Sequence, residues 1–343
     1  MSVYDINGAE LATVYDIDGT VLAQAYDIDG NALIDSRYAI ENVIDYYRQS
    51  TLSVASEVSA LSDDWQSFVF ITDPHGSRNK QHSQAIGMYL LDNTPATMLV
   101  LNGDYSVVNW SQTEYANYMR PFLESNLTDS IYAVCGNHER LGDTFAEAKA
   151  CIYSDFLADK TNIHGQLDEI YYYLDDVPRK TRYMFLNTSD GSGVYNMSST
   201  QISWISQNVI LPATDWSLVV IGHVNLAKMG GVTYENEANG ADIVSAIENC
   251  NGSIVGYFCG HQHIDLTEKI GNIQHTTLTC DKFENSNYYG GLSYTQRVAD
   301  TVTEQTVSVI SINTQTKNVV VRRVGAGWPN AIASLHYSYG ASS

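Results

Sequence analysis

Five short apolar segments of the chain are each followed, within a few residues, by side chains that can ligate a metal ion. These side chains are Asp73, His75, Asp104, Asn137, His138, His223, His261 and His263. Carboxylate, carboxamide and imidazole groups without a thiolate suit Mn, Fe or Zn. This number of ligands exceeds what one tetrahedral ion binds, and it fits two ions that share a bridging carboxylate.

The spacing within two of these groups has a geometric meaning. Asp73-x-His75 and His261-x-His263 are pairs separated by one residue, and each pair lies just past an apolar segment. Side chains at positions i and i+2 of an extended chain point to the same side. We therefore expect the two side chains of each pair to face one point.

The apolar segments that must position these residues alternate with helical patterns. The predicted strands cover residues 68–71, 98–101, 131–134, 218–221 and 254–258, and helices are predicted over 36–61, 79–91 and 111–125. A hairpin is predicted from residues 307–312 and 319–324. Continuous apolar strands alternating with helices indicate a sheet that is covered on both faces. Ligands of such sheets bind beyond the carboxyl ends of the strands, where the loops converge.

Taken in order, the motifs resemble the five blocks of the calcineurin-like metallophosphoesterase superfamily. They read Asp73-x-His75, Gly103-Asp104, Gly136-Asn137-His138-Glu139, Gly222-His223 and Gly260-His261-Gln262-His263. The match extends over residues 66–325, and residues 201–204 are similar to the helix before the fourth block. One such motif is a weak signal, whereas all five in order are specific.

The resemblance implies an α/β fold, a four-layer αββα sandwich, with a centre of two divalent metal ions (Mn, Fe or Zn). The implied ligands are Asp73, His75 and His263 for the first ion, Asn137, His223 and His261 for the second, and Asp104 as the bridge. His138 is not a ligand in the family and lies beside the scissile phosphate. The implied reaction is hydrolysis of a phosphate ester by a metal-bridging hydroxide, assisted by His138.

The chain departs from two branches of that family. Val107 stands where the Ser/Thr protein phosphatases have an aspartate, and Val108 stands where they have a phosphate-binding arginine. Purple acid phosphatases have a tyrosine ligand at the first of these places, and Tyr105 is at the wrong offset to replace it. We therefore expect neither a protein phosphatase nor a tyrosine–iron centre.

The substrate and the roles of three residues near the motifs stay open. Arg78 and Arg140 could hold the phosphate or could be exposed without a role, and Glu139 could orient His138 or only cover the loop. The substrate is a small phosphodiester or a phosphomonoester. Diesters are slightly favoured because the phosphate-clamping arginine is missing.

The first 34 residues repeat Tyr-Asp-Ile-Asn/Asp-Gly every 11 residues. Asn-Gly and Asp-Gly favour tight hairpin turns, so this segment is predicted to be a small β-repeat. Calcium binding is the alternative, although the third oxygen position and the bidentate glutamate of a calcium loop are missing. The repeats resemble, weakly, those of phage-tail or surface-associated proteins of gut bacteria, which suggests an alternative function as a structural or adhesion component acting on phosphodiester-linked surface polymers.

These patterns predict four regions along the chain. They are a repeat segment for attachment or oligomerisation over 1–34, a helical linker over 35–64, the phosphoesterase domain over 65–325 and a tail over 326–343. The repeats would hold the subunits of a homo-oligomer together or would bind an assembly partner.

Composition excludes several classes of protein. The net charge of −21 repels nucleic-acid backbones, and no Lys/Arg cluster interrupts it. The five widely spaced cysteines form no C-x-x-C motif, which argues against a disulfide framework. No run of eighteen apolar residues indicates a membrane span. Residues 1–10 lack the features of a signal peptide, so we expect a cytoplasmic or virion-associated protein.

Overall fold

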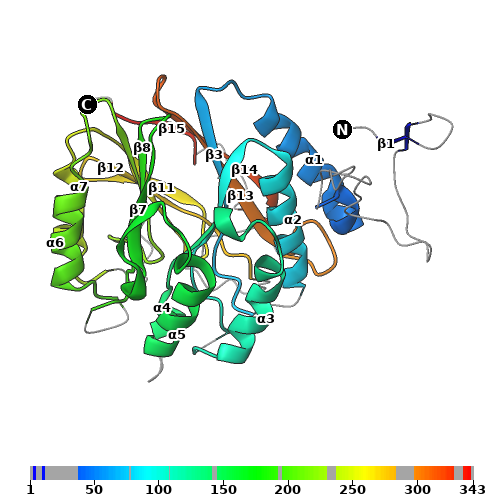
Figure 1. Ribbon diagram of the computed structural model, residues 1–343, viewed down its shortest axis with the longest axis horizontal. Helices are drawn as coiled ribbons and strands as arrows, with labels where there is room; N and C mark the ends of the chain where they lie inside the picture. The colour runs from blue at the N-terminus through cyan, green and yellow to red at the C-terminus, as the bar shows by residue number, and fades with distance from the viewer. Residues whose placement is uncertain are drawn as a thin grey trace.

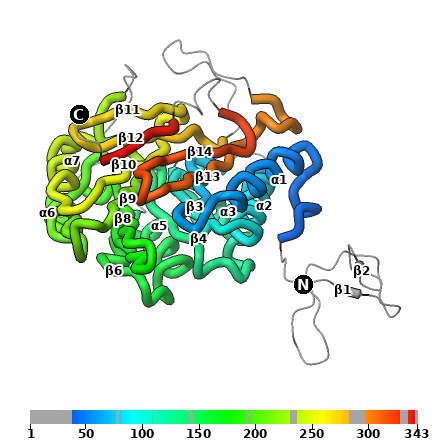
Figure 2. The backbone as a smooth tube through the Cα atoms, turned by 90° about the horizontal axis from the view of Figure 1, so that it is seen from above, coloured from blue at the N-terminus to red at the C-terminus, as the bar shows by residue number. Residues whose placement is uncertain are grey.

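The computed structural model describes residues 38–76, 79–107, 109–140, 145–191, 195–229, 237–282, 297–327 and 335–340, with the backbone of 3–4 and 10–11. Two β-sheets lie face to face at the centre of the molecule (Figure 1). Helices α1, α2 and α3 cover the outer face of one sheet, and α6 and α7 cover the outer face of the other (Figures 1 and 2). The predicted α/β fold with its four αββα layers is confirmed.

The first sheet combines a parallel part with an antiparallel edge. Its strand order is β15 (Tyr337–Ser338), β14 (Asn318–Gly325), β13 (Thr306–Asn313), β3 (Trp65–Ile71), β4 (Ala96–Leu101) and β5 (Ile131–Ala133). Strands β3, β4 and β5 are parallel, and the other pairs are antiparallel. The carboxyl ends of the three parallel strands therefore meet at one edge.

The second sheet repeats this arrangement. Its strand order is β11 (Leu266–Ile270), β12 (Ile273–Thr277), β10 (Ser253–Cys259), β9 (Ser217–Ile221), β8 (Thr181–Phe185), β7 (Tyr171–Asp176) and β6 (Ile163–Gln166). Strands β8, β9, β10 and β12 are parallel, and antiparallel pairs flank them on both sides.

Helices and helical turns connect the strands. The α-helices are α1 (Asp45–Ser59), α2 (Lys80–Asn93), α3 (Gln112–Leu123), α4 (Asn137–Arg140), α5 (Phe145–Ile152), α6 (Ser199–Asn208) and α7 (Gly240–Glu248). The helical turns are η1 (Ile40–Asn42), η2 (Thr128–Ser130), η3 (Tyr153–Leu157) and η4 (Leu167–Glu169). No helix in the described part of the chain is long and apolar enough to cross a membrane.

The apolar strands are buried on both faces because each face contacts a different layer. On β9, Leu218 and Val220 pack with the helices α6 and α7, whereas Val219 and Ile221 belong to the core between the sheets. Alternate residues of a strand point to opposite faces, so a continuous apolar run is what two cores require. For this reason the continuous apolar run in the sequence predicts β9 clearly.

The predicted strands and helices are confirmed with small shifts of their ends, and the largest difference is at residues 36–61. Helix α1 begins only at Asp45, because Val43 and Ile44 are extended after the short turn η1. The apolar stripe is real all the same: Val43 and Tyr47 are buried in the first core. The Tyr47 hydroxyl also accepts a hydrogen bond from the Gln305 backbone N–H at 2.7 Å.

Both ends of the chain contribute strands. Strand β15, from the segment 326–343, pairs with β14. Near the amino terminus, β1 (Val3–Tyr4) pairs with β2 (Glu10–Leu11) in antiparallel register across the first repeat. The other repeats, the calcium alternative and the assembly role predicted for them lie outside the described residues. All five cysteines are free thiols.

Candidate metal centre

The predicted ligands lie at the carboxyl ends of β3, β4, β5, β9 and β10. Backbone hydrogen bonds join their loops: the Asp73 N–H donates to the Gly103 carbonyl at 3.2 Å, and the His75 N–H donates to the Asp104 carbonyl at 3.0 Å. The Gly260 N–H donates to the His223 carbonyl at 3.1 Å. These bonds join neighbouring loops within each sheet, and the His261 N–H, which donates to Asp73 Oδ2 at 2.9 Å, links the loops of the two sheets.

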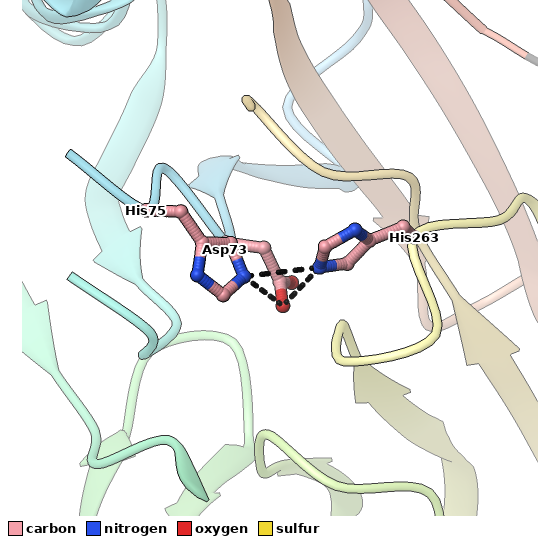
Figure 3. A group of neighbouring side chains, drawn as sticks. All are labelled: Asp73, His75 and His263. Atoms are coloured by element: carbon pink, nitrogen blue, oxygen red, sulfur yellow. Dashed lines mark hydrogen bonds and ion pairs between the residues drawn. The ribbon is translucent and has the colours of Figure 1, made fainter. Parts of the chain in front are cut away.

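The first group of ligand atoms comes from two loops of different sheets. The Asp73 carboxylate lies below the rings of His75 and His263, which point toward each other (Figure 3). The Nε2 atoms of the two rings are 3.1 Å apart, and Asp73 Oδ1 is 3.2 Å from His263 Nε2 and 3.8 Å from His75 Nε2. One nitrogen from each ring and one carboxylate oxygen therefore surround a common point.

The second group adjoins the first. Asp104, His223 and His261 offer ligand atoms within 4.8 Å of one another. Asp104 Oδ2 is 3.1 Å from His223 Nε2 and 3.6 Å from His75 Nε2, so this carboxylate faces both groups. An oxygen in that position can bridge two cations.

Asn137 and His138 come from the first turn of α4. Asn137 is buried, and its Oδ1 atom accepts no hydrogen bond within the described residues. A buried oxygen without a donor is costly unless a cation or water contacts it, so it fits a ligand. His138 forms a third group with His75 and Asp104, and its side chain is 22% exposed.

Backbone carbonyl groups orient two of the imidazoles. His75 Nδ1 lies 3.2 Å from the Ser106 carbonyl, and His223 Nδ1 lies 2.5 Å from the Asn102 carbonyl. A carbonyl can only accept, so Nδ1 carries the proton and Nε2 is left to bind a cation. Sequence inspection missed these contacts because any residue supplies a backbone carbonyl.

The charges of the centre are strongly coupled. Burial acts to raise the pKa of the Asp73 carboxyl, but His223 and His263 hold it well below its usual range. Burial acts to lower the pKa of His223, but Asp104 and Asp73 raise it to about 9. Burial and then His223 lower the pKa of His261 to about 4. The buried carboxylates thus require positive charge beside them, which divalent cations supply when bound.

Glycines in the motifs allow the loops to touch. A Cβ atom on Gly136 would lie 2.1 Å from Asp104 Oδ1, and one on Gly260 would lie 2.3 Å from Asp73 Oδ2. Any larger residue would therefore displace a carboxylate of the centre. Gly136 and Gly260 are explained by this contact, whereas Gly103 also has a φ of 87°, which favours glycine.

The paired motifs face one point for a different reason from the one expected. Asp73, His75, Asp104, His261 and His263 all have positive φ values, from 44° to 65°. This left-handed conformation is unfavourable for side-chain-bearing residues and is found where function requires it. The loops turn sharply after each strand, and the pairs do not continue the extended strand.

Two of the charged neighbours make defined contacts within the structure. The Glu139 carboxylate accepts hydrogen bonds from the backbone N–H groups of Asp104, Tyr105 and Gly136 at 2.8–2.9 Å, so it fastens two loops together. Arg140 donates to the Gly191 carbonyl at 3.3 Å and stacks over Phe145. Arg78 lies outside the described residues.

A buried ion pair behind His263 was not predicted. Asp265 pairs with Arg323 of β14, and the Asp265 carboxylate also accepts from the Thr279 N–H at 3.0 Å. Asp265 continues the His261-x-His263 spacing, which was the available signal. Its partner is 58 residues away in the other sheet, and no local pattern indicates it.

The comparison with known families agrees with this geometry. The profile of the calcineurin-like phosphoesterase family matches residues 67–265, which is more than half of the chain. The chain belongs to the calcineurin-like phosphoesterase family. The five motifs and both groups of ligand atoms fall inside the matched region. A search of curated proteins found no match.

Solved structures that are similar to this chain are distant from it in sequence. GAP50, the anchor in the inner membrane complex of Plasmodium, is 11% identical with a TM-score of 0.52, covering 81% of this chain and 90% of that one. A phosphatase from Mycoplasma pneumoniae is 11% identical with a TM-score of 0.42, covering 78% and 96%. The E. coli phosphoesterase Yfce is 14% identical with a TM-score of 0.31, covering 74% and 91%. At these identities the likeness concerns the fold alone.

Proposed function

We propose that this chain hydrolyses phosphate esters at a centre of two divalent cations. The observation that carries the proposal is the pair of adjoining ligand groups, with the Asp104 carboxylate facing both. Membership of the calcineurin-like phosphoesterase family supports the same reaction class.

In this proposal each ion has its own ligands and shares one. The assigned ligands are Asp73, His75 and His263 for the first ion, Asn137, His223 and His261 for the second, and Asp104 for both. The orphaned Asn137 Oδ1 and the donor set of oxygen and imidazole nitrogen support a fit to Mn, Fe or Zn.

In this proposal the bound ions and His138 have different roles in the reaction. Two bound divalent ions would acidify the attacking water and offset the charge of the phosphate oxygens. The backbone N–H of His138 donates to Asp104 Oδ1 at 2.9 Å, which fixes the first turn of α4 beside the centre. The ring of His138 is more exposed than those of His75, His223 and His263, so it can give a proton to the leaving oxygen.

The substrate is proposed to be a small phosphodiester or a phosphomonoester. The contacts of Arg140 with Gly191 and Phe145 support a site without an arginine clamp on the phosphate. Hydrolysis of bis-p-nitrophenyl phosphate in preference to p-nitrophenyl phosphate is the expected result of lacking such a clamp.

The test combines metal content with activity. Purified chain reconstituted separately with Mn²⁺, Fe²⁺ or Zn²⁺ should carry two ions and hydrolyse at least one of the two nitrophenyl esters. The variant His223→Ala should lose an ion and the activity, and His336→Ala, a histidine bonded to the Val321 carbonyl, is the matched control. Fewer than one ion per wild-type chain together with no hydrolysis would contradict the proposal.

We also propose that residues 1–34 form a separate attachment or oligomerisation segment ahead of the phosphoesterase domain. The antiparallel pairing of β1 with β2 supports a β-repeat, and a structural or adhesion role is the alternative to a purely catalytic protein. Deleting residues 1–34 should lower the assembly state in light scattering and leave ester hydrolysis unchanged. Unchanged assembly would contradict the attachment role.

A further inference from the structure

A groove of about 750 Å³ lies on the second sheet beside α6, at the edge formed by β6 and β7. We call it the α6 groove and define it by Gln166, Glu169, Tyr171, Asp190, Trp204 and Gln207. None of these residues belongs to the five motifs of the metal centre.

An aromatic wall is the first feature of the α6 groove. The Trp204 ring stands at 61° to Tyr171 with 5.1 Å between the ring centres, and it also lies 6.2 Å from Tyr173. Tyr173 is in turn covered by the Arg182 guanidinium at 3.8 Å. The Trp204 ring is therefore held by neighbours while part of it remains exposed, and a fixed aromatic surface of this kind suits stacking.

The polar lining is the second feature. Asp190 already accepts hydrogen bonds from the Ser198 N–H at 2.7 Å and hydroxyl at 2.6 Å, and Glu169 is paired with Lys149. The amides of Gln166 and Gln207 add donors and acceptors on the two sides. Within the described residues no lysine or arginine lines the groove, so an anion finds no partner there.

One loop joins the α6 groove to the metal centre. The loop runs from the end of β8 to the start of α6, and Asp190 lies on its groove side. Next to it, the Gly191 carbonyl accepts from Arg140, two residues after His138. Further along, the Tyr195 ring lies 5.4 Å from the ring of His261. Described residues of this loop therefore lie at the groove, where Asp190 lines it, and beside the metal centre, where Tyr195 contacts His261.

We infer that the α6 groove binds a neutral sugar unit of the substrate whose phosphate ester is hydrolysed at the metal centre. An aromatic face stacks on the C–H face of a sugar ring, and carboxylates and amides bond its hydroxyls. A neutral polyol fits this lining better than a phosphate, which the carboxylates repel, or an apolar group, which leaves the polar lining unpaired. This inference rests on the proposed function for the position of the phosphate.

The first experiment measures binding without turnover. The metal-loaded variant His138→Ala is applied to an array of neutral, anionic and choline-bearing glycans. We expect this variant to bind neutral glycans. The binding should be lost when Trp204→Ala or Gln207→Ala is combined with His138→Ala, and it should be kept when Ile210→Ala is combined with it. Ile210 is a matched apolar control, because it is 50% exposed just beyond α6 and outside the groove. Binding only to anionic or choline-bearing glycans, or to none, would overturn the inference.

The second experiment measures catalysis. The two substrates compared are a phosphodiester that joins C1 of glucose to p-nitrophenol (the sugar diester) and bis-p-nitrophenyl phosphate. Trp204→Ala should raise KM for the sugar diester about tenfold relative to the other ester, as loss of one stacking contact predicts. Equal changes for both esters would overturn the inference and leave the phosphoesterase proposal standing. Glycan binding without hydrolysis of any ester would instead remove the proposed function and keep the sugar site.

Discussion

His138 is more exposed than three other histidines of the metal centre, His75, His223 and His263. Its side chain is 22% exposed, whereas His75, His223 and His263 are at most 8% exposed. Its Nε2 atom lies 3.8 Å from Asp104 Oδ2, farther than His223 Nε2 at 3.1 Å. A ring at the rim of the site can reach the leaving group of a bound ester, which a fully buried ligand cannot.

We therefore predict that His138→Ala keeps both ions and loses catalysis. The kcat for a nitrophenyl ester should fall about 100-fold or more, because a positioned proton donor is removed. Metal analysis of the same sample separates this role from ligation. A variant that has lost an ion would show that His138 is a ligand, consistent with its place in the group with His75 and Asp104.

Glu139 joins two loops beside the metal centre through backbone hydrogen bonds. Its buried carboxylate accepts three backbone N–H bonds, and burial and then Asp104 raise its pKa to about 7. Glu139→Gln replaces an acceptor by an NH₂ group that faces other donors. We expect the free energy of unfolding to fall by about 1–3 kcal/mol.

The measurement for Glu139→Gln is urea unfolding together with metal affinity. The control is Glu114→Gln, where a partly exposed carboxylate accepts one N–H bond, from Val107 at 3.0 Å. Metal affinity should fall for Glu139→Gln, because the Asp104 backbone N–H loses its acceptor. Metal affinity should be unchanged for Glu114→Gln. Equal effects of the two variants would show that the three-bond contact has no special role.

At the scale of elements, β12 contains a buried histidine outside the site. His275 is fully buried, and neither ring nitrogen has a hydrogen-bond partner in the described residues. Burial lowers the pKa of His275 from 6.5 to about 4. The unfolded chain therefore takes up a proton at a higher pH than the folded chain.

This difference predicts an acid-sensitive strand. The free energy of unfolding is unaffected by His275 above pH 6.5 and falls by about 3 kcal/mol as the pH drops toward 4. His275→Phe should reduce that slope by its own contribution in urea unfolding with a chelator present, and the slope that remains comes from other buried imidazoles such as His261. His164→Phe, at an exposed position of β6, should keep it. An unchanged slope in His275→Phe would disprove this assignment.

The same elements show how far the sequence predicts the fold. Strands β3, β4, β9 and β10 were found because two cores require apolar residues on both faces. Strands β7 and β11 were missed because their sequences, YYYLDD and LTEKI, mix polar and apolar residues; β11 is an edge strand of the second sheet, and β7 lies next to the edge strand β6. Their partners are close in the sequence, β12 for β11 and β6 and β8 for β7, but these strands also mix polar and apolar residues.

The residues of the candidate site were easier to predict from the sequence than the contacts that position them. Motif residues such as Asp73 and His263 carry chemistry that is visible in the sequence, and the structure brings them together. Their left-handed backbone and the carbonyl groups behind His75 and His223 depend on the packing of loops from two sheets. These features follow from tertiary structure, so residue types alone do not reveal them.

At the scale of the whole molecule, the metal centre depends on how the two sheets are held together. His75 comes from the first sheet and His263 from the second, and their Nε2 atoms are 3.1 Å apart. The buried pair of Asp265 and Arg323 connects the same two sheets directly behind His263. A shift between the sheets would therefore separate the ligands of one ion.

We predict that Arg323→Met destabilises the fold by about 3–5 kcal/mol, because it leaves the Asp265 carboxylate buried and unpaired. The neighbouring Arg322→Met breaks a pair with the half-exposed Glu57 at 3.0 Å and should cost about 0–1 kcal/mol. In urea unfolding, the double variant Asp265→Leu with Arg323→Met should recover part of the loss, since no lone charge remains. If Arg323→Met costs no more than Arg322→Met, the buried pair does not hold the sheets in register, and metal affinity will be unchanged as well.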